Sequence, residues 1–424
     1  MCTGFALAET TQNQVRPEMR PSVVLAANVV QSVRPVERPT QDVQVALDPS
    51  DPNFQSWIKD FKKRARAKGI ADRVLGEAFD GVKYDADVVR RDRNQSEFTK
   101  TIWDYLDSAV SDTRIRNGQA ALRDHADTFA KIETRFGVEK EVVAAVWGLE
   151  SAYGSFRGSN DIIRSLATLA FDGRRASFFE AQLMAALRIL ASGDTRARNM
   201  TGSWAGAMGH TQFMPTSYLE YAVDFTGDGK RDIWGKDPTD ALASTAAYLS
   251  RFGWTSGQPW GIEVTLPKDF DYRTASRKIK KSGADWMALG VRSAESEALP
   301  DHGPGSILLP AGGKGAAFLI FRNFSVIERY NTADAYVIGI GHLSDRLGGA
   351  TAFKTPWPRG DRALTFDERR EMQRRLSQRG FDTKGIDGKI GPLTIAAVRA
   401  FQVVSGLVPD GYASLALLTA LRDS

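Results

Sequence analysis

Apolar residues recur at intervals of three and four along most of this chain, the spacing that buries one face of an α-helix. Phe54, Trp57, Ile58 and Phe61 begin the pattern. We predict further helices over 98–134, 138–152, 175–192 and 239–252. Strand-like runs are few, and we expect them at 260–266, 316–320 and 325–327. The spacing therefore predicts a mainly α (α+β) fold, in which a helical domain carries a small β insertion.

One predicted helix carries a carboxyl group on its apolar face. Val143, Val146, Trp147 and Glu150 follow the helical spacing, and Gly154 marks the end of the helix. Burial and the negative end of the helix dipole both disfavour the ionised carboxyl group, which suits a general acid for a glycosidic oxygen. The alternative is a glutamate satisfied by internal hydrogen bonds or reaching the surface. The spacing alone does not decide between them.

A glycine-rich loop follows at residues 202–209, where backbone can approach a ligand closely. Just beyond it, Gln212 can hydrogen-bond a sugar amide, and Phe213 offers an apolar platform for a sugar ring. A packed turn would account for the same residues.

Two motifs carry a resemblance to a known family. Residues 147–154 read WGLESAYG, and residues 202–215 read GSWAGAMGHTQFMP. Together they resemble the B family of membrane-bound lytic murein transglycosylases, over residues 52–355. The resemblance implies a lysozyme-like catalytic domain in which Glu150 is the lone catalytic acid and base. It also implies a set of substrate-binding residues: Tyr105, Arg174, Arg175, Gln212, Phe213, Tyr248, Tyr330, Asn331 and Tyr336.

The chain departs from the family pattern at His210 and Thr211, where a Tyr-Gly pair is common, and at Ala247, where Asn is common. Asp172 lies beside the two arginines and is expected to pair with one of them. No second carboxylate in these motifs has a claim to catalysis, whereas hydrolytic glycosidases ordinarily use two. The resemblance implies that the C6 hydroxyl of N-acetylmuramic acid attacks C1, giving a 1,6-anhydro sugar without water or a catalytic cofactor.

Residues 224–232 fit the first nine positions of an EF-hand loop. Position 12 is Gly235 rather than Glu, and Asp240 is the better replacement ligand. We expect a structural Ca²⁺, or Na⁺ in its place, although an Asp-Gly turn that only caps the following helix is the alternative. The candidate ligands are Asp224, Thr226, Asp228, Lys230 through its carbonyl, Asp232 and Asp240.

Residues 387–394 read DGKIGPLT, and with this run the chain resembles the common peptidoglycan-binding domain, a three-helix bundle, over residues 366–421. We place this module at 364–424, after a predicted linker at 356–363. The module contains a weak internal repeat, Ile386-Asp387-Gly388 and Pro409-Asp410-Gly411. Each Asp-Gly pair can make the turn that precedes a helix. Pro392 is placed to begin the next helix at its first position. We therefore divide the chain into a signal remnant and disordered tether at 1–50, a catalytic domain at 51–355, the linker, and this module.

The N-terminal residues Phe5-Ala6-Leu7-Ala8 resemble the end of a signal peptide, and Cys2 could instead carry a lipid. The expected location is the periplasm, after export and with a potential outer-membrane anchor. Cys2 is the single cysteine, so no intramolecular disulfide can form. The formal net charge of +5 is too diffuse to indicate nucleic acid. We expect a monomer that acts on peptidoglycan glycan strands, with other cell-wall enzymes as candidate partners.

Two other functions remain open at this point. A lysozyme-like hydrolase (a muramidase) would need water activated by another carboxylate. A non-catalytic cell-wall-binding scaffold would keep the fold without the chemistry. Intact Glu150, Gln212 and Tyr330 favour the transglycosylase over the scaffold.

Overall fold

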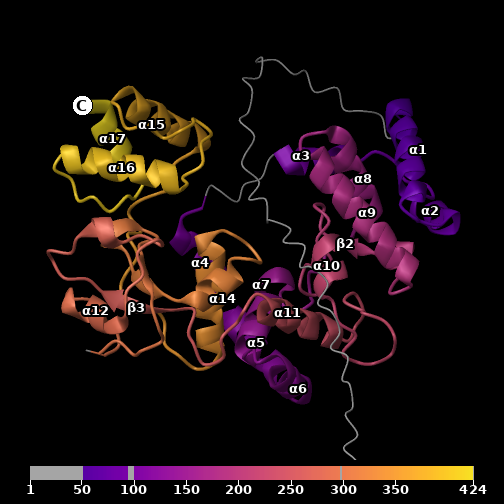
Figure 1. The fold of residues 1–424 in the computed structure, drawn as a ribbon, viewed down its shortest axis with the longest axis horizontal. Helices are drawn as coiled ribbons and strands as arrows, with labels where there is room; N and C mark the ends of the chain where they lie inside the picture. Colours follow the sequence, from indigo (N-terminus) through magenta and orange to yellow (C-terminus); the bar gives the residue numbers. More distant parts are fainter. Residues whose placement is uncertain (1–50, 94–99, 297, 424) are drawn as a thin grey trace, which may run out of the picture. The chain divides into compact units, whose positions relative to one another are not determined.

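The computed structural model describes residues 51–93, 100–296 and 298–423, so the predicted signal remnant, tether and Cys2 lie outside the described residues. Helices dominate, as predicted, and the strands are short (Figure 1). In the catalytic part, the helices are α1 Pro52–Ala67, α2 Asp72–Ala78, α3 Ala86–Arg93, α4 Ile102–Ala109, α5 Asp112–Asp124, α6 Ala126–Phe136, α7 Lys140–Ser151, α8 Ile162–Asp172, α9 Ala176–Ser192, α10 Pro215–Tyr221, α11 Thr239–Arg251, α12 Gly283–Ala288, α13 Arg322–Ile327 and α14 Asp334–Leu347. No helix among the described residues is both long enough and apolar enough to cross a bilayer.

Two predicted segments differ from the structure. The helical stretch expected over 98–134 is described from residue 100 on and consists of three helices, α4 to α6. Thr101 and Ser111 each accept a backbone N–H bond at the start of α4 and α5, whereas α6 begins after His125 without a side-chain cap. The strand expected at 325–327 is wrong, since these residues belong to α13. Phe324 and Ile327 lie three residues apart and are both buried, which is helical spacing.

Helix α7 lies at the centre of the helical domain. Residues 142–148 are all buried. The helix packs against α14, α5 and α11, and Figure 1 shows these helices gathered around it. The catalytic candidate Glu150 therefore stands on a helix that is largely buried.

The predicted β insertion is a four-stranded antiparallel sheet in the order β4-β3-β6-β5. Gly261 pairs with Ile320, and Ser306 pairs with Ile320 from the other side. The fully buried Trp286 anchors a separate apolar core on this sheet. The strands are β3 Gly261–Thr265, β4 Arg292–Ser293, β5 Ser306–Leu308 and β6 Ala317–Ile320; β1 Asn160–Asp161 and β2 Thr201–Gly202 form a second small sheet.

The predicted linker at 356–363 is not a free tether. The Trp357 ring lies 6.4 Å from the rings of both Trp103 and Phe318. Arg359 forms a two-point ion pair with Asp107 on α4, at 2.7 and 2.9 Å. Packing of this kind holds the segment against the helical domain.

The C-terminal module is a three-helix bundle, as predicted, with α15 Phe366–Gln378, α16 Pro392–Val404 and α17 Leu415–Asp423. Leu376, Val398 and Phe401 are buried, and Pro392 begins α16. Nine buried residues form its core: Leu364, Met372, Leu376, Ala397, Val398, Phe401, Leu417, Leu418 and Leu421.

The two similar Asp-Gly turns of this module are each held by the side chain of one glutamine, an arrangement that we call a glutamine clamp. Gln373 Nε2 donates to Asp387 Oδ1 at 3.0 Å, and its Oε1 accepts from the Gly388 N–H at 2.8 Å. Gln402 repeats both bonds, to Asp410 at 2.8 Å and from Gly411 at 2.8 Å. Each clamp ties a helix to the Asp-Gly turn that follows it.

Candidate active site

The catalytic helix ends in an unusual turn. Glu150 lies in the last turn of α7, as predicted, and the helix stops at Ser151. Ala152, Tyr153 and Gly154 then have φ of 48°, 58° and 83°, which is strained backbone for the first two residues. Ser151 Oγ stabilises this turn, because it accepts from the Gly154 N–H at 3.0 Å and donates to the His210 carbonyl.

The Tyr153 side chain stabilises this turn by packing between two helices. Its hydroxyl donates to the Arg114 carbonyl at 3.0 Å, and the ring passes between α7 and α5. A Cβ on Gly148 would lie 2.6 Å from the Tyr153 hydroxyl oxygen, and one on Gly118 would lie 2.3 Å from it. Glycine is therefore required on both helices for the tyrosine to pass.

We expect Gly148→Ala to lower the free energy of unfolding by about 1–3 kcal/mol, because the added methyl group overpacks the site. Gly76→Ala is the matched control, since Gly76 lies in helix α2 and an added Cβ there has nothing within 4 Å. The control should gain about 0.5–1 kcal/mol through helix propensity. Urea unfolding of both variants measures the difference, and equal losses would contradict this account.

Two tyrosines from the last part of the catalytic domain face Glu150. Tyr336 on α14 donates its hydroxyl hydrogen to Glu150 Oε1 at 2.6 Å. Tyr330 donates to the Thr211 carbonyl at 2.8 Å. Burial first, and then the charge of Glu150, raise the pKa of both tyrosines well above the ordinary value. Both hydroxyls are therefore neutral donors, and Tyr336 fixes one carboxyl oxygen of Glu150.

Tyr105 on α4 belongs to the same region. A Cβ on Gly339 of α14 would lie 3.0 Å from Tyr105 Cε1, so the tyrosine packs directly on that helix. Its phenol also contributes to the raised pKa of Tyr336. The structure thus brings Tyr105, Tyr330 and Tyr336 to the end of α7 that carries Glu150.

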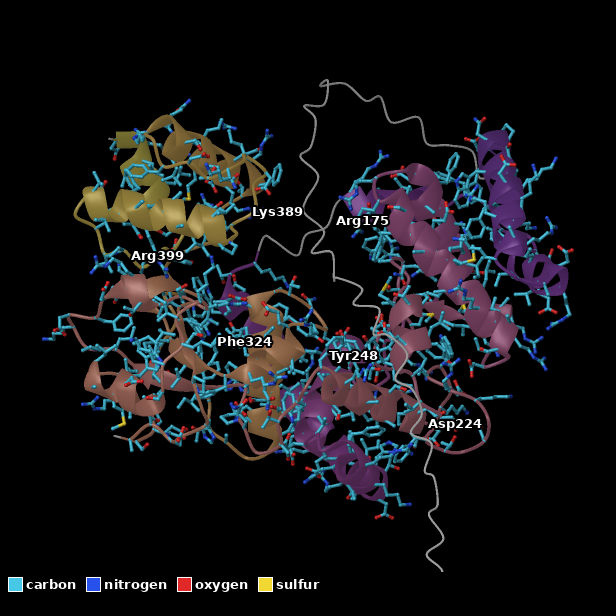
Figure 2. The ribbon with its side chains drawn as sticks, in the orientation of Figure 1. Arg175, Asp224, Tyr248, Phe324, Lys389 and Arg399 are labelled. Carbon is cyan, nitrogen blue, oxygen red and sulfur yellow. The ribbon has the colours of Figure 1, made fainter. Side chains whose placement is uncertain are left out.

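Phe213 and Tyr248 are placed differently from the prediction. Phe213 is 2% exposed, and its ring packs against those of Tyr248 and Tyr330, each 5.9 Å away. Its face is therefore not available as the sugar platform that the sequence suggested. Tyr248 is also buried and donates to the Arg329 carbonyl at 2.7 Å. Both rings support Tyr330 rather than forming a groove surface (Figure 2 labels Tyr248).

Gln212 braces the glycine-rich loop. It has φ of 54°, and its Nε2 donates to the carbonyls of Arg157 at 3.0 Å and Gly209 at 2.8 Å. These bonds use its amide hydrogens, so Oε1 is the atom left to accept from a sugar amide. Asn331 is exposed, and its Oδ1 accepts from the Ala333 N–H at 3.0 Å, which shapes the loop before α14.

Arg174 and Arg175 are held by an acid that the sequence did not single out. Both bind Asp92, which is 1% exposed, at 2.5 and 2.8 Å. The expected pairing of Asp172 with one of them is wrong, because Asp172 binds Arg93 at 2.8 Å. The Arg174 side chain is 39% exposed and the Arg175 side chain 42% exposed, so both guanidinium groups retain N–H donors for a ligand.

The predicted ion loop gathers three carboxylates. Asp224, Asp228 and Asp240 each offer an oxygen within 4.8 Å of the others. Asp240 is buried and accepts three backbone N–H bonds, from Phe225, Thr226 and Asp232, at 2.9 to 3.0 Å. Burial first, with the Asp224 charge adding to it, raises the pKa of Asp240. A divalent cation fits this set of hard oxygen donors.

The other predicted ligands take part in the loop itself. Thr226 Oγ1 donates to Asp224 at 3.3 Å. Asp232 Oδ1 accepts the N–H groups of Trp234 and Gly235, both at 2.9 Å. Lys230 N–H donates to Asp228 at 2.9 Å. The loop is thus already folded around its acidic residues.

His210 is a residue of the site that sequence reasoning noted only as a departure from a family pattern. Trp147 Nε1 donates to His210 Nδ1 at 3.1 Å, and His210 Nε2 faces the Gly235 carbonyl at 2.9 Å. Burial is the main cause that lowers its pKa, so the imidazole is neutral and joins the catalytic helix to the ion loop. Its partners are 63 and 25 residues away in the chain, so no local signal predicted the contact.

Comparison with protein families gives two matches. Residues 53–345 match the model described as "Transglycosylase SLT domain". Residues 366–421 match "Putative peptidoglycan binding domain". A curated relative, "Membrane-bound lytic murein transglycosylase B" of Escherichia coli (strain K12), is 30% identical over 314 residues, which is 70% of this chain and 83% of the relative.

Solved structures agree with these matches. SltB3 from Pseudomonas aeruginosa, in complex with NAG-anhNAM-pentapeptide, is 48% identical with a TM-score of 0.85, and the match covers 87% of this chain and 99% of that chain. The Escherichia coli lytic transglycosylase Slt35, in complex with calcium, is 28% identical with a TM-score of 0.60, and the match covers 74% and 98%.

Proposed function

The chain belongs to the transglycosylase SLT family, and we propose that Glu150 cleaves the glycan strand by acting first as an acid and then as a base. The protein is a lytic murein transglycosylase with a C-terminal peptidoglycan-binding domain.

The contact that supports this role is the 2.6 Å hydrogen bond from Tyr336 to Glu150 Oε1. It fixes one oxygen of the carboxyl group at the end of α7. A fixed carboxyl group is what proton transfer to a glycosidic oxygen requires, since geometry limits general acid catalysis. In the first step, protonated Glu150 gives its proton to the oxygen that leaves C1, and the C1–O bond breaks.

In the second step, the C6 hydroxyl of the N-acetylmuramic acid attacks C1, and its proton returns to the Glu150 carboxylate. A 1,6-anhydro sugar forms, no water is consumed, and Glu150 ends in its starting protonation state. The bond that breaks is the β-1,4 bond between N-acetylmuramic acid and N-acetylglucosamine. The SltB3 complex with NAG-anhNAM-pentapeptide supports this choice of product.

Digestion of purified sacculi tests the proposed product. The soluble muropeptides are weighed by mass spectrometry, and the proposal expects products lighter by one water than hydrolytic ones. Reducing ends would instead identify a lysozyme-like hydrolase. Pelleting onto sacculi without any release would identify a wall-binding scaffold.

We propose that the cluster of Asp224, Asp228 and Asp240 holds a structural Ca²⁺, supported by the convergence of their oxygens within 4.8 Å and by the calcium complex of Slt35. The ion would neutralise three carboxylates that otherwise repel one another. It would stand apart from the chemistry, which Glu150 carries.

Adding 5 mM CaCl₂ to protein stripped with chelator is therefore expected to raise the melting temperature by about 3–6 °C, which is binding free energy expressed as stability. Asp228→Asn should remove most of the rise, because the exposed Asp228 would be one of the three carboxylate ligands. Asp269→Asn, an exposed acid outside the cluster, is the control. A rise of equal size in all three proteins would place the ion elsewhere.

We also propose that the enzyme works in the periplasm. The support is its peptidoglycan substrate and its membrane-bound curated relative. Osmotic-shock fractionation of cells that express the full-length gene would test this, and recovery with cytoplasmic marker enzymes would contradict it.

A further inference from the structure

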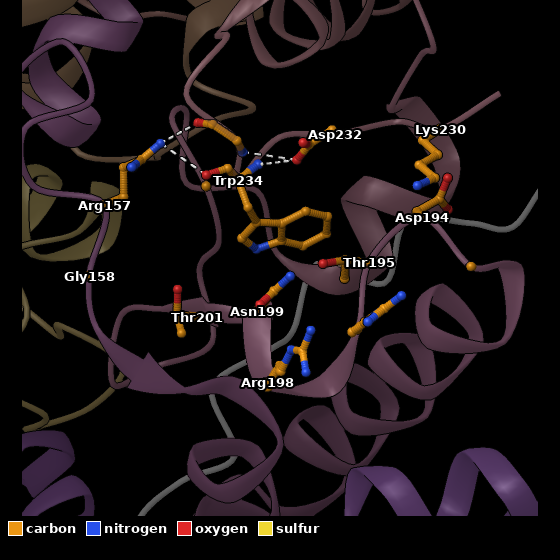
Figure 3. Close-up of a pocket in the computed structure, with 14 residues that line it drawn as sticks. Arg157, Gly158, Asp194, Thr195, Arg198, Asn199, Thr201, Lys230, Asp232 and Trp234 are labelled. Atoms are coloured by element: carbon orange, nitrogen blue, oxygen red, sulfur yellow. Dashed lines mark hydrogen bonds between the residues drawn. The ribbon is translucent and has the colours of Figure 1, made fainter. Parts of the chain in front are cut away.

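A cavity of about 540 Å³ lies between the ion loop and the segment that follows α9 (Figure 3). Arg196, Arg198 and Asn199 line one side of it, and Lys230 and Trp234 of the ion loop line the other. The predicted substrate residues do not line this cavity, and the steps proposed for Glu150 do not use it. It is large enough for a ligand the size of a dipeptide or a sugar phosphate.

The charges that line the cavity are unbalanced. Its cations are Arg157, Arg196, Arg198 and Lys230, and its acids are Asp194 and Asp232. Asp194 is neutralised by Arg231, whose Nη2 lies 2.6 Å from Asp194 Oδ2. Asp232 keeps its negative charge, with Oδ1 accepting the backbone N–H groups of Trp234 and Gly235, and the four cations outnumber it. Like charges around one cavity repel one another, and an anion within it relieves that repulsion.

Arg157 is fixed in place at the edge of this cavity. Its Nη1 donates to the Trp234 carbonyl at 2.9 Å and to the Gly235 carbonyl (Figure 3). The same atom lies 2.9 Å from His210 Nε2. A guanidinium held in this way loses little entropy when it binds a ligand, because its position is already set.

The cavity also has uncharged lining residues. Trp234 is one of them, but its Nε1 is inaccessible to solvent, so this N–H group does not face the cavity. Asn199, Thr195 and Thr201 add further polar side chains to the lining.

We propose that this cavity binds a small ligand that carries two or more acidic oxygen groups. Carboxylates and phosphates share this chemistry, and planar guanidinium groups recognise both through paired hydrogen bonds. The peptide stem of peptidoglycan carries free carboxylates, and its choice as the first probe rests on the proposed function. Phosphate-bearing ligands are the second source.

The side chain of Gln212, a predicted substrate residue, connects the cavity to the glycine-rich loop. Gln212 Nε2 binds the carbonyls of Arg157 and Gly209, and both of these residues line the cavity. An anion here would therefore bind close to Gln212, while Glu150 does not line the cavity. Its binding can be measured separately from cleavage.

Isothermal titration of the full-length protein tests the proposal with two probes, a sugar-free tetrapeptide stem and inorganic pyrophosphate. Neither probe has a glycosidic bond, so the result does not depend on the reaction assigned to Glu150. We expect at least one probe to bind, with an affinity that falls as salt is raised. Binding of the peptide alone would assign the site to stem carboxylates, and binding of pyrophosphate would assign it to phosphates.

The double variant Arg196→Gln/Arg198→Gln should weaken that binding by about tenfold or more, since each charge-assisted bond contributes strongly. Arg188→Gln/Lys268→Gln removes the same charge from exposed positions outside the cavity and should bind as the unmodified protein does. The proposal is overturned if neither probe binds, or if both double variants weaken binding equally. A sacculus digest with the same variants shows separately whether the reaction proposed for Glu150 holds.

Discussion

Glu150→Gln is expected to lower the release of anhydro-muropeptides from sacculi by about 10³-fold or more, because the amide can neither give nor take the proton. The substitution keeps the shape of the side chain. Gln Oε1 can still accept the hydrogen bond that Tyr336 donates at 2.6 Å, so the fold around the end of α7 should be preserved. The measurement is mass spectrometry of the soluble products at several enzyme concentrations.

Glu141→Gln is the matched control for this result. Glu141 lies in the first turn of the same helix and pairs with Lys140 at 3.2 Å. Its loss removes an equal charge from α7 and should leave the activity within about twofold, since exposed pairs contribute little. Anhydro products from Glu150→Gln at the unmodified rate would show that another group is the acid.

Asp345→Asn is expected to stabilise the protein above neutral pH and to have little effect at pH 4. Burial raises the pKa of Asp345 on α14 to about 7, although its carboxylate accepts a 2.8 Å hydrogen bond from Trp260 Nε1. The group is therefore protonated in the folded protein at pH values where it is ionised in the unfolded chain. Asparagine keeps an acceptor for Trp260 and carries no charge.

The direction in which Asp345 changes the folding stability with pH follows from proton linkage. A carboxyl group with a raised folded pKa favours folding fully below the unfolded value of 3.8, and this contribution is lost as the pH rises to about 7. The shift corresponds to about 4 kcal/mol at most, and partial exposure of Asp345 should reduce it to about 2 kcal/mol. Unfolding of both proteins in urea at pH 4 and pH 8 gives the difference.

His342 on the same helix also makes the stability depend on pH, so the Asp345→Asn variant must be compared with the unmodified protein at each pH. Burial lowers its pKa to about 4, so its own contribution to stability is lost as the pH falls from 6.5. The pH dependence of stability due to Asp345 and that due to His342 have opposite signs in the unmodified protein. Measuring the unmodified protein alone would therefore reveal neither contribution. The difference between the variant and the unmodified protein at each pH removes the part due to His342, and a difference that does not change with pH would refute a buried protonated Asp345.

Local patterns in the sequence predicted the parts of the site that lie on one element. The spacing of Val143, Val146, Trp147 and Glu150 placed the carboxyl group in the last turn of α7, where the structure has it. Two Asp-Gly pairs and Pro392 predicted the turns and the helix start of the C-terminal module. In each case the bonds join residues that are close in sequence or follow one periodic face.

Contacts between distant elements were not predictable in this way. An aromatic residue beside a glycine-rich loop can face a sugar or the core, and only the positions of Tyr248 and Tyr330 show that Phe213 faces the core. The pairing of Arg174 and Arg175 with Asp92 joins segments 82 and 83 residues apart. The cationic cavity is built from three separate loops, so none of its arginines stands out in the sequence.

The two glutamine clamps bear on how the C-terminal module opens. Each clamp holds a turn by two side-chain bonds to one glutamine, while the helices share a core of only nine buried residues. Loss of a clamp would release its turn while the bundle stays packed, so the module would exchange amide hydrogens in two separate steps. The slowest exchange would then lie in the facing helices, with Gly388 and Gly411 marking the two places where local opening begins.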